Sequence, residues 1–163
     1  SDFLRRVANA PTKTRASRLR AIEKAMRVAV PSLAQLEQIH DKAGVPHLRG
    51  RFEHWRPNAG WQDERQFSDG TLRLIALLWI LMEDQAPLLL EEPELSLNGA
   101  IVREIPGMLH AATRKRPRQI LVSTHSGDLL ADRGIALEEI LMVTPVREGS
   151  KVEVAANRKD VRA

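Results

Sequence analysis

Two adjacent carboxylates, Glu91 and Glu92, follow a short apolar run at residues 88–90 and precede Pro93. Like charges this close repel each other unless a cation or a proton lies between them. A carboxylate at the end of a strand can hold Mg²⁺ directly or through water, and a second can orient a water for attack on a phosphate. The pair therefore predicts a site in which a bound metal ion balances the negative charge.

Two further polar clusters have residue types that suit phosphate chemistry. Ser68-Asp69-Gly70-Thr71 precedes an apolar helical pattern, and the free N–H groups at a helix N-terminus form a ready anion site. His125 follows a second apolar run at residues 119–123, where it could hydrogen-bond a transferring γ-phosphate. Alone, these features are also typical of a helix cap, an acidic turn and a capped or core histidine. Their combination and order indicate phosphoryl transfer.

The elements that must position these residues alternate between helix and strand. Apolar periodicity predicts helices at residues 17–30, 72–83 and 98–113, strands at 33–40, 47–55, 87–90 and 119–123, and a closing hairpin at 140–146 and 151–155. A strand, a helix and a second strand in this order predict a parallel α/β sheet. The unalternating runs at 87–90 and 119–123 are typical of central strands covered on both faces. Both polar clusters then fall at the carboxyl ends of the strands, where such sheets bind ligands.

Composition narrows the setting. The chain has 163 residues, of which 43% are hydrophobic, as expected for a globular domain with a real core. It has no cysteine, which excludes a disulfide framework and a thiolate metal site. The longest apolar stretch, residues 74–82, is too short to cross a membrane, and no signal peptide is recognisable, so we expect a cytoplasmic protein. The first residue is serine, which is consistent with a processed chain or an excised piece.

Positive charge is concentrated in the first third of the chain. Residues 1–60 carry 12 Lys and Arg against 5 Asp and Glu, whereas the whole chain has a net charge of +4. The basic side chains between residues 5 and 27 fit the solvated face of a helix, and they also fit a nucleic-acid contact. The sequence leaves both interpretations open.

Two segments together resemble motifs of ABC-type ATPases. Residues 67–73, FSDGTLR, are similar to the signature motif in the variant of RecF-like and SMC-like ATPases. Residues 88–94, LLLEEPE, are similar to the Walker B motif, which implies that Glu91 contacts Mg²⁺ and that Glu92 is the catalytic carboxylate. The resemblance implies ATP and Mg²⁺ as cofactors, with Ser68 to Thr71 closing in trans over nucleotide held by the other subunit of an ATP-dependent homodimer.

Two more segments extend the resemblance. Residues 95–98, LSLN, fall on the D-loop, with Asn98 where the family commonly has aspartate, and residues 120–126 resemble the strand that carries the switch histidine, here His125. The signature serine precedes the second glutamate by 24 residues, and the histidine follows that glutamate by 33, as in the family. Glu91 in place of aspartate, and Thr71 where transporters carry glutamine, point to the RecF-like and overcoming-lysogenization-defect-like branch. The resemblance covers about residues 17–156.

One motif of the family is absent from the 163 residues. No G-x-x-x-x-G-K-[ST] run is present to wrap the β- and γ-phosphates. The resemblance therefore implies the C-terminal lobe of a P-loop NTPase-like fold. Residues 1–60 would form a helix and an antiparallel hairpin leading into the lobe, and residues 61–163 would form the lobe itself. A Walker A lobe, on the same or a separate chain, would have to complete it, and the chain alone is expected to be inactive.

Two other classes of function remain open on the sequence. One is a non-catalytic module, derived from such an ATPase, that binds a protein partner or nucleic acid through its basic first third. The other is an unrelated α/β domain with accidental motifs, which the joint spacing of the motifs disfavours.

Overall fold

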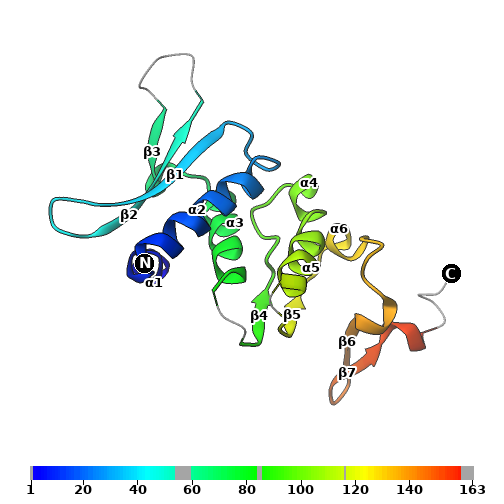
Figure 1. Ribbon diagram of the computed structural model, residues 1–163. Helices are drawn as coiled ribbons and strands as arrows, with labels where there is room; N and C mark the ends of the chain where they lie inside the picture. The colour runs from blue at the N-terminus through cyan, green and yellow to red at the C-terminus, as the bar shows by residue number, and fades with distance from the viewer. Residues whose placement is uncertain (1, 54–59, 84–85, 116, 159–163) are drawn as a thin grey trace.

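The computed structural model describes residues 2–53, 60–83, 86–115 and 117–158, and Figure 1 shows an extended arrangement of three small sheets and the helices between them. Residues 54 and 55 of the second predicted strand lie outside the described residues. The helices are α1 (Asp2–Asn9), α2 (Thr12–Met26), α3 (Asp69–Leu81), α4 (Gly99–Val102), α5 (Ile105–Lys115) and α6 (Gly127–Leu130). The strands are β1 (Leu33–His40), β2 (Pro46–Phe52), β3 (Trp61–Asp63), β4 (Leu88–Glu91), β5 (Ile120–Ser123), β6 (Leu141–Val146) and β7 (Gly149–Val154).

An antiparallel sheet in the order β1-β2-β3 forms the N-terminal part, with α1 and α2 beside it. The predicted hairpin is confirmed, since β1 and β2 pair from Leu33 opposite Phe52 to His40 opposite Pro46. Helix α1 and strand β3 are additions to the prediction. β3 pairs with β2 through only three residues, which is too short for a periodic pattern to reveal.

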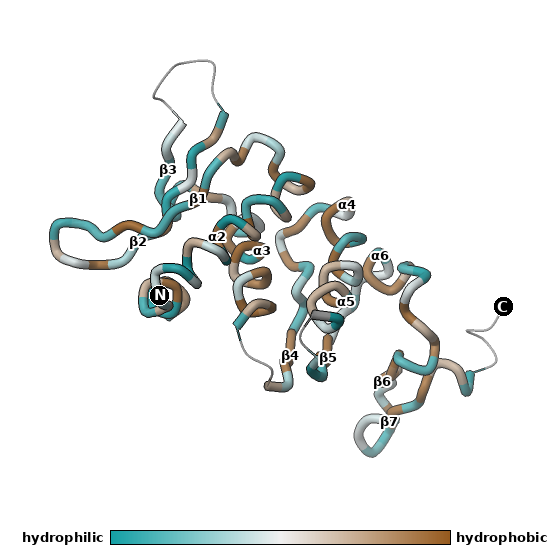
Figure 2. The backbone as a smooth tube through the Cα atoms, viewed as in Figure 1, coloured by the Kyte–Doolittle hydropathy of each residue, from teal (hydrophilic) through white to brown (hydrophobic). Residues whose placement is uncertain are grey.

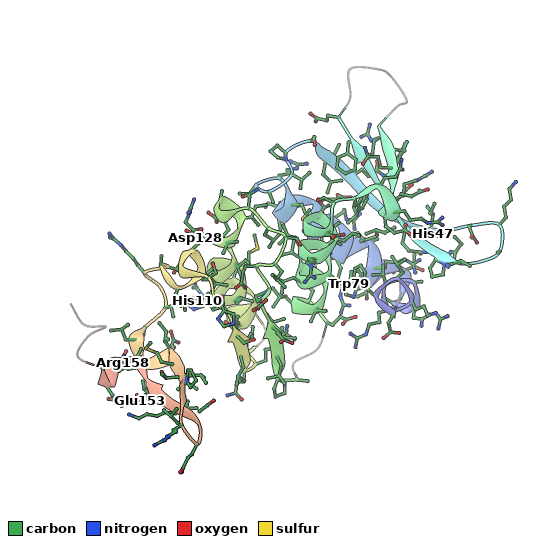
Figure 3. All side chains as sticks on the ribbon, turned by 180° about the vertical axis from the view of Figure 1, so that it is seen from behind. His47, Trp79, His110, Asp128, Glu153 and Arg158 are labelled. Atoms are coloured by element: carbon green, nitrogen blue, oxygen red, sulfur yellow. The ribbon has the colours of Figure 1, made fainter. Side chains whose placement is uncertain are left out.

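Helix α3 contributes side chains to two hydrophobic clusters. Leu74, Ile75 and Trp79 pack into the first cluster, with α1, α2 and the antiparallel sheet. Leu77 and Leu81 pack into the second cluster, with α5 and the inner side of β4 and β5. Figure 2 shows this hydrophobic segment at the centre of the molecule, and in Figure 3 Trp79 lies between His47 of β2 and Asp128 of α6.

Strands β4 and β5 pair in parallel, from Leu88 opposite Ile120 to Glu91 opposite Ser123. The crossover between them was predicted as one helix over residues 98–113, but it divides into α4 and α5. Pro106 explains the break, because it has no N–H to donate and its ring clashes with the carbonyl four residues earlier, at Val102. α4 ends at Val102.

The prediction that this parallel sheet is covered on both faces is wrong for the described residues. The side chains of Leu88, Leu90, Ile120 and Val122 pack against the second cluster. On the opposite face, Leu89 is 75% exposed and Leu121 is 45% exposed. An unalternating apolar run shows that both faces can be buried, but it cannot show what covers them.

The closing hairpin was predicted correctly, with β6 paired to β7 from Leu141 opposite Val154 to Val146 opposite Gly149. It lies at one end of the molecule, beyond α6 (Figure 1). No helix among the described residues is long and apolar enough to cross a membrane. The fold is thus a mixed α/β arrangement in which a parallel pair of strands places its carboxyl ends side by side.

Candidate functional site

The carboxyl ends of β4 and β5 bring Glu92 and His125 together. The Glu92 N–H donates to the Ser123 carbonyl (2.9 Å), which continues the pairing of the strands by one residue. Beyond that bond, His125 Nε2 lies 3.5 Å from Glu92 Oε1. The His125 side chain is 93% exposed and the Glu92 side chain 32% exposed, so both remain accessible to a ligand. The structure therefore places the two residues predicted to be catalytic within reach of one another.

Glu91 and Glu92 differ in their surroundings although they are adjacent. Side chains alternate along a strand, so Glu91 shares the exposed face of β4 with Leu89. Glu92 follows the strand with φ at 42°, in the left-handed region that non-glycine residues rarely adopt. Such backbone strain is concentrated at functional sites, because surrounding contacts must enforce it.

Ser68 caps α3, as the sequence predicts. The Thr71 N–H donates to Ser68 Oγ (3.2 Å), and Ser68 Oγ lies 2.9 Å from Thr71 Oγ1. Asp69 occupies the first turn of α3, where a negative charge favours the helix dipole. In this structure Ser68 thus bonds its own helix, which is the capping role. Ser68 and Asp69 are exposed.

The cap of α3 packs directly against residues 95–98, the predicted D-loop. A β-carbon built on Gly70 would lie 2.3 Å from the Ser96 carbonyl oxygen, so only glycine permits this approach. Ser96 itself has φ at 65°. A cavity of about 260 Å³ lies at this junction, and its lining includes Ser68, Thr71 and Asn98. The structure thereby joins two predicted motifs, the signature and the D-loop, that lie 22 or more residues apart in the chain.

Asn98 has a local structural role. Its side-chain Oδ1 accepts a hydrogen bond from the Ile101 N–H (3.1 Å) and so caps α4. The side chain is therefore engaged within its own chain.

One pair of residues at the site was missed from the sequence. The Thr124 hydroxyl donates to Glu94 Oε1, and Glu94 Oε2 is a buried oxygen with no hydrogen-bond partner among the described residues. Glu94 stood within the predicted Walker B run, but no role was assigned to it. The sequence did offer one signal, because Glu94 is a third carboxylate directly after Pro93. It lies in a segment that must turn back towards the end of β5.

The residues at the strand ends include two carboxylates, which are suitable ligands for Mg²⁺. No group of three or more His, Asp or Glu side chains that could hold a metal is found within the described ranges. Mg²⁺ does not require one, since it is commonly bound by one or two carboxylates together with waters and substrate phosphates. Glu91 and Glu92 fit such a site, whereas the backbone cradle for the phosphates has no counterpart in the sequence.

The basic first third is partly committed to structure. The Arg15 guanidinium donates to the Ala8 carbonyl (2.7 Å) near the end of α1, and Arg18 stacks over the Trp79 ring at 5.1 Å. Arg6 pairs with Glu83 at 3.6 Å. Other basic residues on or next to α2, namely Lys13, Arg20, Lys24 and Arg27, are exposed.

Comparisons with known proteins give a consistent picture. A family model described as "AAA domain, putative AbiEii toxin, Type IV TA system" matches residues 4–132. No curated protein sequence matches the chain significantly.

Several solved structures share the fold. One comes from work on ATP-driven dimerization and DNA-stimulated activation of SMC ATPases; it has a TM-score of 0.62 at 15% identity and covers 85% of this chain and 83% of its own. The Smc head bound to the C-winged helix domain of ScpA gives a TM-score of 0.64 at 16% identity, covering 85% of this chain and 42% of its own. The Smc head with a coiled coil and joint from Pyrococcus yayanosii gives a TM-score of 0.63 at 16% identity. This match covers 90% of the present chain and 29% of the Smc chain.

At these identities the structural matches establish the fold, which is that of SMC ATPase heads. The chain covers most of the first of these matched chains and less than half of the other two. The family match covers well over half of the chain and includes residues 67–73 and 88–98 and His125. The chain therefore belongs to the AAA-domain family that this model describes, a group of ATPase-type proteins.

Proposed function

We propose that the chain is the C-terminal lobe of a RecF/SMC-like ATPase, which binds and hydrolyses ATP with Mg²⁺ once a Walker A lobe completes it. The observation that carries the proposal is the pairing of Glu92 with His125, 3.5 Å apart at the ends of two parallel strands. This is where an α/β sheet binds its ligand. A carboxylate and an imidazole that both remain accessible can act on one phosphate group and its attacking water.

In this proposal each residue acts on a different part of the substrate. Glu91 holds Mg²⁺, which would neutralise charge on the β- and γ-phosphates. Glu92 orients and polarises the attacking water, and His125 hydrogen-bonds the γ-phosphate. Ser68 to Thr71 present the N-terminus of α3 to nucleotide bound by a second subunit, so that ATP drives homodimerisation. The first structural match concerns ATP-driven dimerization of SMC ATPases, which supports this part of the proposal.

The exposed face of the parallel sheet is where we place the Walker A lobe. Leu89 and Leu121 lie uncovered on that face, and Glu91 shares it. Burying a leucine side chain is worth about 1.5–3 kcal/mol, so an uncovered apolar face of this kind favours a docked partner. A lobe seated there would bring its P-loop to the carboxyl ends of β4 and β5.

The test compares the chain alone with the chain and its Walker A lobe, on one polypeptide or two. We expect the two-lobe protein to hydrolyse ATP and the chain alone neither to hydrolyse ATP nor to bind it tightly, because the P-loop supplies much of the phosphate affinity. Titration of Mg²⁺·ATP into the chain alone checks this directly. Micromolar binding that is insensitive to Glu91→Ala would overturn the assignment.

A second function is favoured by the exposed basic residues Lys13, Arg20, Lys24 and Arg27. These side chains would allow the lobe to contact nucleic acid in the cytoplasm. If the chain is non-catalytic, they would instead bind a protein partner or nucleic acid. Phosphate contacts of this kind weaken steeply with salt. Fluorescence anisotropy with a labelled duplex at two salt concentrations tests the contact, and Arg20→Glu with Lys24→Glu should abolish it.

A further inference from the structure

We propose that Glu94 is a positioning residue, which acts through the Thr124 hydroxyl to hold the turn that presents His125 to Glu92. The Thr124 hydroxyl makes two hydrogen bonds, one to Glu94 and one to the backbone of the residue that follows His125. It donates to Glu94 Oε1, and it accepts from the Ser126 N–H at 2.9 Å. The backbone on either side of His125 is therefore tied, through one oxygen, to the turn that follows Glu92.

His125 needs such a tie because its own side chain does not anchor it. The imidazole is 93% exposed, and its ion-pair contact within the described ranges is with Glu92, at 3.5 Å. Packing against the core cannot fix a side chain with that exposure. The placement of the imidazole must come from its backbone, and the Thr124 hydroxyl controls that backbone.

The carboxylate of Glu94 is an unfavourable choice on stability grounds alone. Glu94 Oε2 is buried and has no hydrogen-bond partner among the described residues, and an unpaired buried oxygen is costly to desolvate. A charged acceptor, however, makes a stronger hydrogen bond to a hydroxyl than a neutral one does. We infer that the strong bond to Thr124 is what the glutamate contributes.

The turn that carries Glu94 is well placed for this role. The Leu95 N–H donates to the Glu92 carbonyl at 3.1 Å, and the Leu97 N–H donates to the Glu94 carbonyl at 3.0 Å. These bonds fix the Glu94 backbone to that of Glu92. A shift of Thr124 relative to Glu94 is therefore a shift of His125 relative to Glu92.

The geometric step is tested in the 163-residue chain by amide hydrogen exchange at Ser126. We expect Glu94→Ala to raise the exchange rate of the Ser126 amide by about tenfold or more. The Thr124 hydroxyl, which accepts from that amide, would lose its hydrogen bond to the charged Glu94 carboxylate. Thr124→Ser keeps the hydroxyl and should stay within about twofold of the wild-type rate. Glu94→Gln keeps only a neutral acceptor, so it should give an exchange rate between those of the wild type and Glu94→Ala. Glu148→Ala, in the exposed β6–β7 turn, is the matched control and should leave Ser126 unchanged.

Wild-type exchange at Ser126 in Glu94→Ala would overturn the proposal. If Glu94→Ala unfolds the chain, Glu94→Asp gives the same test, because the shorter carboxylate keeps its charge but should lose contact with the Thr124 hydroxyl. Protection of Ser126 in Glu94→Asp equal to that of the wild type would then overturn it.

The catalytic step rests on the proposed function and uses the two-lobe protein. We expect Glu94→Ala to lower kcat about a hundredfold, as misplacement of a reacting group by about 1 Å can do, with KM changed by less than about twofold. Glu94→Gln, which keeps a neutral acceptor for the Thr124 hydroxyl, should give an intermediate kcat. Equal kcat per folded molecule in Glu94→Ala and wild type would overturn the positioning role. A wild-type two-lobe protein without ATPase activity would instead overturn the proposed function, while the Ser126 exchange result would still stand.

Discussion

The Ser96 carbonyl oxygen lies so close over Gly70 that a β-carbon on Gly70 would be 2.3 Å from it. Ser96 reaches this position with a left-handed backbone, φ 65°, two residues before Asn98 caps α4. The N-terminus of α3 and the segment after β4 are thus in backbone contact. Any movement of one, for example on nucleotide binding, is transmitted to the other.

This contact predicts that Gly70→Ala lowers the free energy of unfolding by about 1–3 kcal/mol, because backbone atoms must separate to admit the methyl group. Gly107→Ala is the matched control. It lies in α5 with nothing within 4 Å of the added carbon, so it should stabilise by about 0.5–1 kcal/mol. Urea unfolding followed by circular dichroism measures both. Equal effects of the two substitutions would show that the Gly70 contact is not tight in solution.

Ser68 offers a test that separates capping from recognition of nucleotide in trans. Asp is as good an N-cap as Ser, so Ser68→Asp should leave stability within about 0.5 kcal/mol, whereas Ser68→Ala should cost about 1 kcal/mol. If the cap faces a partner's γ-phosphate, the added negative charge of Ser68→Asp should block ATP-driven dimerisation of the two-lobe protein. Light scattering with and without ATP measures the dimer. Normal dimerisation of Ser68→Asp would leave only the capping role.

Glu92 should be needed for turnover and dispensable for nucleotide capture. In the two-lobe protein we expect Glu92→Gln to abolish hydrolysis, since the amide cannot polarise the attacking water, and to retain bound ATP in a stabilised dimer. Single-turnover kinetics together with light scattering separate the two effects. A wild-type turnover rate in this variant would reduce Glu92 to a turn residue.

The sequence predicts the pairing of Glu92 with His125 because both residues end apolar runs joined by a helical crossover, and parallel strands end at one edge. It also predicts the Ser68 cap from residue type alone. The sequence could not predict the contact of Gly70 with Ser96. That contact depends on a left-handed backbone at Ser96, and no neighbouring residue type signals this conformation. The bond from Thr124 to Glu94 was equally hidden, since side-chain reach across a turn has no sequence period.

His47 and Glu64 form a buried pair whose charges should make stability depend on pH. His47 Nδ1 lies 2.7 Å from Glu64 Oε1, and His47 Nε2 lies 3.5 Å from Asp41 Oδ2. The hydrogen bond to Glu64 raises the pKa of His47 above its ordinary 6.5, although burial and the nearby Arg65 oppose this. Burial alone would raise the pKa of Glu64, but hydrogen bonds from His47 and the backbone bring it below its ordinary 4.5.

The two shifts together define a pH window. A raised histidine pKa gives stability that is fully present below pH 6.5 and is lost as pH rises through the folded-state pKa. A lowered glutamate pKa gives stability that is present above pH 4.5 and is lost as pH falls through its folded-state value. We therefore expect His47→Gln to destabilise the chain more at pH 5.5 than at pH 9, as measured by urea unfolding at both pH values. An equal loss at both would show that His47 contributes no charge to the pair.

The exposed face of β4 and β5 gives the sharpest test of how the chain is completed. Leu89 is 75% exposed, so Leu89→Lys should change the stability of the chain alone by no more than about 0.5 kcal/mol. If a Walker A lobe covers this face, the same substitution places an unpaired charge in an apolar contact and should weaken association of the two lobes by about tenfold or more. Val28→Lys is the matched control, because Val28 is 70% exposed and precedes β1, away from this face. With the lobes supplied as separate chains, calorimetric titration should show weak binding for Leu89→Lys and wild-type binding for Val28→Lys. Equal affinities for Leu89→Lys and wild type would place the Walker A lobe elsewhere and leave Leu89 as a solvent-exposed leucine.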